Sequence, residues 1–254
     1  MNKRQRIVVG NWKMYVESPE AARKFAASLR KKSRSLLGVE AWLAPAFPLM
    51  GAVAAALKGS SIKLGAQTVS AHADAPHTGE VSAKMLKLSG VSFVIIGHSE
   101  RRAMGESDEV IRAQIAQALG AGLTVVLCVG EHERVPDGSH WALVANQISR
   151  ALHGAPALGP RLIVAYEPVW AIGKTAAQAL RGEELEEAAI FIRKILAETI
   201  SRDAAVKVPI LYGGSVEPAN ARVLIQEGGV QGLLVGHASA DIDSFIEILK
   251  ACKK

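Results

Sequence analysis

Eight short apolar runs recur along the chain, separated by longer stretches with helical periodicity. The runs are nearly continuously apolar rather than alternating, as expected for strands that are buried on both faces of a sheet. They begin at Ile7, Val39, Ile62, Val91, Leu123, Arg161, Val208 and Val230. Because a helical stretch follows each run, the pattern predicts parallel strands joined by helical crossovers.

The stretches between the runs carry signals for the start of a helix. Ser18, Pro19 and Glu20 supply an N-cap, a first-turn proline and a first-turn acid. Further helices are predicted to begin near Ser107 and at about Asp241. A fourth is predicted around residues 185–196, where apolar side chains recur at helical spacing.

Eight strand–helix units without a linker predict an α/β protein, a (β/α)8 TIM barrel formed as a single domain by residues 1–254. The structural rival is an open, doubly wound sheet. Its usual nucleotide signature, G-x-G-x-x-G after the first strand, is missing, since that strand ends in GNWKM. The closed barrel is therefore the favoured architecture.

Composition and charge add few constraints. The 254 residues are 49% hydrophobic and 21% charged, which is ordinary for a globular domain with a large core. The net charge of +6 comes from scattered residues without interleaved aromatics, so we expect no nucleic-acid partner. No run approaches the length of a membrane span, and we expect no membrane partner. Cys128 and Cys252 form neither a disulfide framework nor a metal pattern, which favours a cytoplasmic location.

Polar residues and glycines follow the ends of the predicted strands. In a barrel of this kind the C-terminal ends of all strands meet at one rim, where active sites are built. The residues placed there are Asn11, Lys13, His98, Glu100, Glu167, Gly213, Gly214, Ser215, Gly236, His237 and Ser239. Each alone has an ordinary explanation as a turn or a solvated side chain, so the argument depends on their convergence.

Together these residue types indicate one kind of chemistry. Glycine-containing turns after strands seven and eight expose backbone N–H groups that suit a phosphate. A carboxylate, Glu167, could act as a general base next to a carbonyl polarised by the His98 imidazole. Lys13 could stabilise the negative charge that develops. The set predicts proton transfer beside a carbonyl through an enediolate, without a metal or cofactor.

The motifs also resemble those of a known family. GNWKM, GAQ, HTGEVSAKML, VIIGHSERR, CVGE, AYEPVWAIG and YGGSV occur in this order and span nearly the whole chain. They are similar to the signatures of triosephosphate isomerases. The resemblance implies a cofactor-independent isomerase that interconverts dihydroxyacetone phosphate and glyceraldehyde 3-phosphate.

The resemblance also implies a role for each matching residue. Glu167 would be the base and His98 the neutral electrophile. Lys13 would stabilise charge, with Asn11 beside it and Glu100 orienting it. The phosphate would be bound by backbone groups of Gly173, Ser215, Gly236 and His237. A lid at residues 170–176 would exclude water, and a homodimer would form through the loop 72–80, with Thr78 reaching the neighbouring site.

Two departures from the family pattern leave more than one substrate compatible with the sequence. The segment AIGKT is two residues shorter than the family's usual A-I-G-T-G-K-T, and His237 stands where a second glycine is usual. The His237 side chain could simply point to solvent, or it could contact a phosphate or a longer sugar. The alternatives are therefore an isomerase of a four-carbon ketose phosphate, such as erythrulose phosphate, and a non-catalytic barrel that binds phosphosugars.

Overall fold

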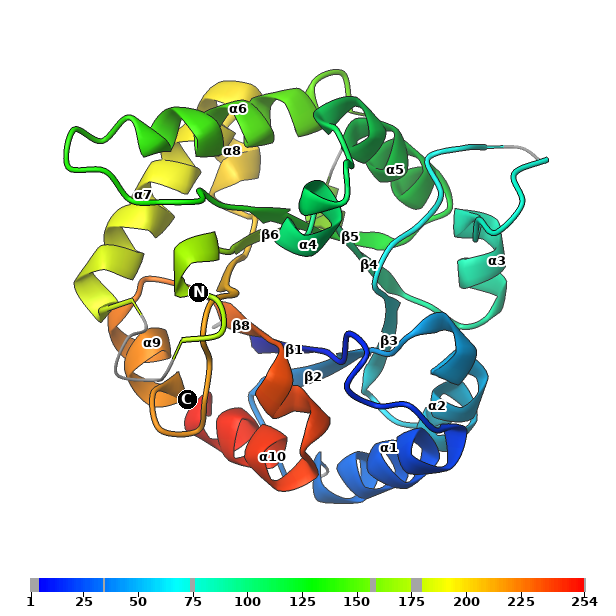
Figure 1. Ribbon diagram of the computed structural model, residues 1–254. Coiled ribbons are helices and arrows are strands. Elements are labelled where there is room, and N and C mark those ends of the chain that lie inside the picture. Colours follow the sequence, from blue (N-terminus) through cyan, green and yellow to red (C-terminus); the bar gives the residue numbers. More distant parts are fainter. Residues whose placement is uncertain (1–4, 34, 74–75, 156–158, 175–179, 254) are drawn as a thin grey trace.

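The eight predicted strands form a closed parallel barrel in the order β1 to β8, which confirms the predicted fold (Figure 1). The computed structural model describes residues 5–33, 35–73, 76–155, 159–174 and 180–253. Its strands are β1 Arg6–Asn11, β2 Val39–Ala44, β3 Lys63–Ala66, β4 Phe93–Ile96, β5 Thr124–Val129, β6 Leu162–Tyr166, β7 Ile210–Tyr212 and β8 Gly232–Val235.

Helices surround the barrel. They are α1 Pro19–Ser33, α2 Met50–Leu57, α3 Ala83–Leu88, α4 Ser99–Ala103, α5 Asp108–Gly120, α6 His140–Leu152, α7 Gly182–Thr199, α8 Arg202–Ala205, α9 Ala221–Glu227 and α10 Ile242–Ala251. The predicted caps are present, since the Ser18 and Ser107 hydroxyls and the Asp241 carboxylate accept N–H groups of α1, α5 and α10.

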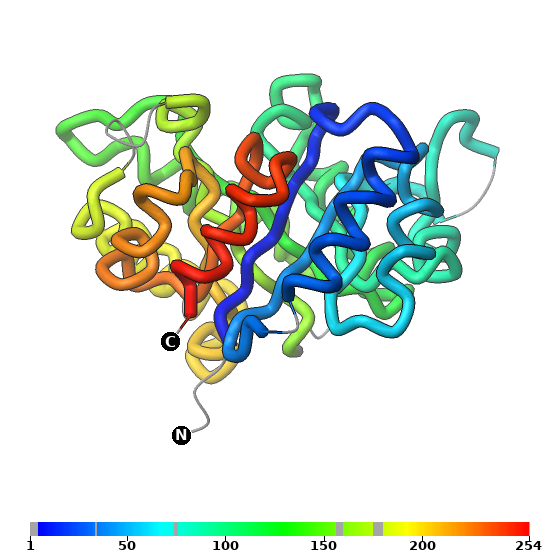
Figure 2. Tube along the Cα trace, turned by 90° about the horizontal axis from the view of Figure 1, so that it is seen from below, coloured from blue at the N-terminus to red at the C-terminus, as the bar shows by residue number. Residues whose placement is uncertain are grey.

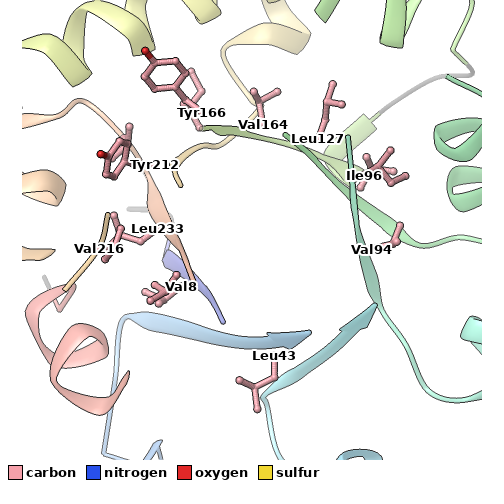
Figure 3. Close-up of a cluster of buried hydrophobic side chains, with 14 of the residues drawn as sticks. Val8, Leu43, Val94, Ile96, Leu127, Val164, Tyr166, Tyr212, Val216 and Leu233 are labelled. Atoms are coloured by element: carbon pink, nitrogen blue, oxygen red, sulfur yellow. The ribbon is translucent and has the colours of Figure 1, made fainter. Parts of the chain in front are cut away.

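Strand side chains pack on both faces of the sheet. Those that point outward meet the helices and form the larger core cluster, which includes Leu127, Val164 and Leu233 (Figure 3). Those that point inward fill the barrel, where the rings of Trp42 and Phe93 lie 4.8 Å apart. The burial of both faces explains why the strand sequences are continuously apolar.

The barrel has one functional rim because all strands run in the same direction. Figure 2 shows β1 running from the lower to the upper edge of the molecule, so the loops that follow the strands lie at the upper edge. Among the described residues, short 3-10 helices stand in three of these loops: η1 Phe47–Leu49 after β2, η3 Val169–Ala171 after β6 and η5 His237–Ala240 after β8. The predicted polar residues follow separate strands and therefore lie at one edge of the barrel.

Candidate functional site

A pocket of about 270 Å³ opens at this rim. It is lined by residues that follow β1, β4, β6, β7 and β8. The predicted residues among them are Asn11, Lys13, His98, Glu167, Gly173, Gly213, Gly214, Ser215, Gly236 and His237. Residues that the sequence places after separate strands therefore lie together at one cavity.

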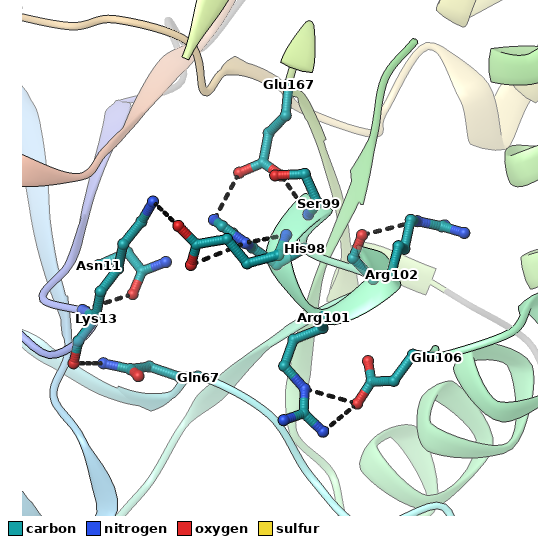
Figure 4. A network of polar contacts seen from close by, with 11 residues as sticks. Asn11, Lys13, Gln67, His98, Ser99, Arg101, Arg102, Glu106 and Glu167 are labelled. Carbon is teal, nitrogen blue, oxygen red and sulfur yellow. Dashed lines mark hydrogen bonds and ion pairs between the residues drawn. The ribbon is translucent and has the colours of Figure 1, made fainter. Parts of the chain in front are cut away.

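Glu167 follows the last residue of β6, and its side chain is almost fully buried. Both carboxylate oxygens face donors: Oε1 lies 3.2 Å from His98 Nε2, and Oε2 accepts the Ser99 N–H at 3.2 Å (Figure 4). Gly213 leaves the space beside this side chain free, because a Cβ there would lie 2.8 Å from Glu167 Cγ. The lack of a side chain at Gly213 thus allows the carboxylate to lie at the pocket wall.

His98 caps the N-terminus of α4. Its Nδ1 accepts the Glu100 N–H at 3.2 Å, so Nδ1 carries no proton in this arrangement. The remaining ring proton is then on Nε2, which faces Glu167 and the pocket. This arrangement presents a neutral imidazole as a hydrogen-bond donor at the cavity.

Lys13 is held by a local network. Its backbone has a φ of 46°, and among the described residues it is the one residue other than glycine that lies in the left-handed region. Its Nζ lies 2.7 Å from Glu100 Oε1. Asn11 Oδ1 accepts the Lys13 N–H at 3.1 Å, and the Gln67 amide donates to the Lys13 carbonyl at 3.0 Å (Figure 4). These contacts support a strained backbone that aims the cation into the pocket.

The glycine-containing turns after β7 and β8 also line the pocket. Gly236 caps η5, and a Cβ there would lie 3.7 Å from Lys13 Cε, so the lysine stem passes close to this turn. The turn after β7 does not itself begin a helix, because α9 begins only at Ala221. The Ser215 hydroxyl donates to the Lys174 carbonyl and joins this turn to the described part of the predicted lid.

The His237 side chain contacts an aromatic ring of another rim loop. It is exposed and lies edge-on to the ring of Tyr15, with centroids 5.2 Å apart. Tyr15 also lines the pocket. The contact joins the loops after β1 and β8 at the mouth of the cavity.

The first residues of the predicted lid are anchored by Glu131. Its Oε1 accepts hydrogen bonds from the Trp170 indole at 2.8 Å and from the Tyr166 hydroxyl at 2.9 Å. Burial, together with the Glu131 charge, raises the pKa of Tyr166, which therefore stays protonated as a donor. The structure describes the lid as far as Lys174, and its residues 175 and 176 lie outside the described part of the chain.

Cys128 lies inside the barrel next to Glu167. Burial, and then the neighbouring carboxylate, raise the pKa of the Cys128 thiol well above its usual range. The thiol therefore stays protonated near neutral pH and acts as a small, inert neighbour of the carboxylate. Within the ranges that the structure describes, no group of three or more His, Cys, Asp or Glu side chains is arranged to hold a metal ion.

Several contributors to the site were missed from the sequence. Ser99, Gln67 and Glu131 each follow a strand within the motifs GHSE, GAQ and CVGE, so their position at the rim was a usable signal. Tyr15 had no such signal, because an exposed loop residue can point in any direction. In the described part of the chain, no helix is long and apolar enough to cross a membrane.

Comparison with known proteins shows similarity along nearly the whole chain. A family profile described as triosephosphate isomerase matches residues 6–252. The triosephosphate isomerase of Thiobacillus denitrificans is 43% identical over 259 residues, which cover 99% of this chain and 100% of that protein. That of Carboxydothermus hydrogenoformans is 42% identical over 252 residues, covering 97% and 98%. The crystal structure of the Bartonella henselae triosephosphate isomerase has a TM-score of 0.83 and 33% identity, covering 97% of this chain and 98% of that one.

Proposed function

The chain belongs to the triosephosphate isomerase family, and from that premise we propose how its rim residues interconvert dihydroxyacetone phosphate and glyceraldehyde 3-phosphate. The reaction moves a proton between two neighbouring carbons and needs no cofactor. The observation that carries the proposal is the buried Glu167 carboxylate beside the His98 imidazole, within one pocket.

Glu167 is the proposed base. It takes a proton from the carbon next to the substrate carbonyl, leaving an enediolate, and returns it to the former carbonyl carbon while the hydroxyl proton passes to the former carbonyl oxygen. Since both carboxylate oxygens face donors on His98 and Ser99, the side chain turns away from them to reach the substrate. The space left by Gly213 permits that movement.

His98 and Lys13 are the proposed partners of the base. The Nε2–H of His98 donates to the substrate carbonyl oxygen, which acquires negative charge as the proton leaves. The Lys13 ammonium lines the same pocket and stabilises that charge. Asn11 and Glu100 hold Lys13 in place through its N–H and its Nζ.

The phosphate group is proposed to lie against the glycine turns. Backbone N–H groups of Gly173, Ser215, Gly236 and His237 are the proposed donors. The exposure of the His237 ring supports a backbone role for this residue, because its side chain is turned toward Tyr15. The names of the relatives favour the three-carbon substrate over a four-carbon one and over a non-catalytic barrel.

A paired assay tests the proposed substrate. We expect kcat/KM for glyceraldehyde 3-phosphate to exceed that for erythrulose phosphate by about tenfold or more, because a pocket built for three carbons rejects an extra one. Coupled dehydrogenase assays on both substrates measure the ratio. A ratio near one, or in favour of the four-carbon sugar, would contradict the proposal. The absence of turnover of both substrates would contradict it as well.

A homodimer is also proposed, formed through the loop 72–80. Its described parts project from the barrel beside α3 in both views (Figures 1 and 2). The stacked rings of His72 and His77, 3.7 Å apart, hold the two arms of the loop together. Met14 and Met85 expose 84% and 59% of their surface, and such apolar groups suit a partner surface.

Sedimentation tests the homodimer. We expect the protein to sediment at twice the mass of the 26.9 kDa chain and the Thr78→Arg variant at the mass of one chain. Thr78 is exposed within the projecting loop, and a charge placed there would be buried without a partner in the dimer. A wild-type monomer, or a dimer that persists in the variant, would rule out this interface.

We propose a cytoplasmic location. Cys128 and Cys252 are both buried and unpaired. Free, buried thiols suit a reducing compartment, because disulfides are rare there.

A further inference from the structure

Gln147 interrupts the apolar stripe of α6 at a buried position. The buried residues of this helix are Val144, Gln147, Ile148, Ala151 and Leu152, and Gln147 is only 5% exposed. A buried amide costs free energy unless its donors and acceptor are paired. Its hydrogen-bond partners therefore indicate what it does.

Both ends of the Gln147 amide bind the same residue, Gly130. The Gly130 N–H donates to Gln147 Oε1 at 2.8 Å, and Gln147 Nε2 donates to the Gly130 carbonyl at 3.1 Å. Gly130 follows the last residue of β5, so its peptide groups lie just beyond the strand. The side chain thus supplies the partners that these buried backbone groups require.

Gly130 lies directly against the backbone of the proposed base. A Cβ on Gly130 would be 1.9 Å from the Glu167 carbonyl oxygen, so the two backbones are in close contact. On either side of this contact, the Glu167 N–H donates to the Val129 carbonyl at 2.8 Å and the Val169 N–H donates to the Glu131 carbonyl at 2.9 Å. The position of Gly130 therefore constrains the position of Glu167.

The residue after Gly130 anchors the start of the predicted lid. The buried Glu131 carboxylate accepts the Trp170 indole N–H and the Tyr166 hydroxyl. A shift of the Gly130 peptide would move this carboxylate as well. One helix side chain is thus connected to both the base and the lid through a single glycine.

We propose that Gln147 is a positioning residue for the isomerase reaction: it fixes the Gly130 peptide and through it sets the placement of Glu167 and of the Glu131 anchor. The inference rests on the proposed function for its kinetic consequence. Gln147 does not touch the pocket, whose described lining residues do not include it, so it acts on turnover through these neighbours.

The test compares Gln147→Met with Ile148→Ala. Methionine keeps the length of the side chain but leaves the Gly130 groups unpaired. We expect kcat to fall by about tenfold or more, since small displacements of a reacting group are costly. KM should change less than kcat, because three of the four proposed phosphate donors, Ser215, Gly236 and His237, follow β7 and β8. Ile148→Ala, a core deletion at the next position of α6, is expected to lower stability without this loss of kcat.

A second variant, Gln147→Glu, adds a pH signature. The ionised carboxylate would face the Gly130 carbonyl, whereas the protonated acid can donate to it and still accept the N–H. We expect the ratio of variant to wild-type kcat to rise as the pH is lowered, while the ratio for Gln147→Met stays flat. A merely structural role would not produce this difference.

Hydrogen exchange provides a readout that is independent of activity. We expect faster exchange at the Gly130 and Glu167 amides in Gln147→Met than in Ile148→Ala. Unchanged protection at both amides, or kcat in Gln147→Met no lower than in Ile148→Ala, would overturn the positioning role. If the wild-type protein does not turn over triose phosphates, the proposed function is wrong. The exchange result would still decide the role of Gln147.

Discussion

Replacement of Glu167 by glutamine is expected to lower kcat by about three orders of magnitude, within the range that a positioned general base contributes. The amide oxygen can still accept the Ser99 N–H, so the local fold is preserved while the proton acceptor is lost. The phosphate turns follow other strands, and KM for glyceraldehyde 3-phosphate is expected to change little. Steady-state kinetics in both reaction directions measure the effect.

The control for this variant is Glu133→Gln. Glu133 is an exposed carboxylate outside the residues that line the pocket, and its replacement changes the net charge by the same amount. We expect its kcat to match that of the wild type. A Glu167→Gln variant that keeps more than about a tenth of the wild-type kcat would show that another group removes the proton.

The rim could be predicted because it depends only on strand direction. Once eight buried strands are recognised as parallel, the residues after each of them must share one edge, and Glu167 and Lys13 follow without knowledge of any contact. Helices with caps and stripes were predictable for the same reason. The short α4 and α8 were not predicted, because five and four residues give no periodic signal.

The contacts within the site could not be predicted from strand order. The tautomer of His98 depends on a hydrogen bond from a backbone N–H two residues away, and the backbone of Lys13 adopts a conformation that its residue type disfavours. The role of Gln147 could not be predicted for a different reason. In the sequence it is a polar interruption of a helical stripe, and only the fold places Gly130 opposite it.

Lys13→Met is expected to lower kcat/KM by about 10²–10³-fold, the usual cost of removing one donor that faces developing negative charge. The Lys13 side chain is only 18% exposed, and its Nζ is held by Glu100, so the cation is placed in advance in a partly dry pocket where its field is strong. We expect kcat to fall and KM to rise together, because the ammonium interacts with both the bound substrate and the transition state. Steady-state kinetics with either triose phosphate measure both parameters.

Two comparisons separate this effect from general electrostatics. Lys31→Met removes the same charge from the exposed last turn of α1 and is expected to leave kcat/KM unchanged. If Glu100 acts by orienting Lys13, the double variant Lys13→Met/Glu100→Gln should be no worse than Lys13→Met alone, since the loss of one partner already removes their shared contribution. Additive losses would mean that Glu100 acts on the reaction through His98, whose Nδ1 lies 3.8 Å from Glu100 Oε2, rather than through the lysine. The size of the non-additivity therefore measures how much of the Lys13 effect depends on its placement rather than on its charge.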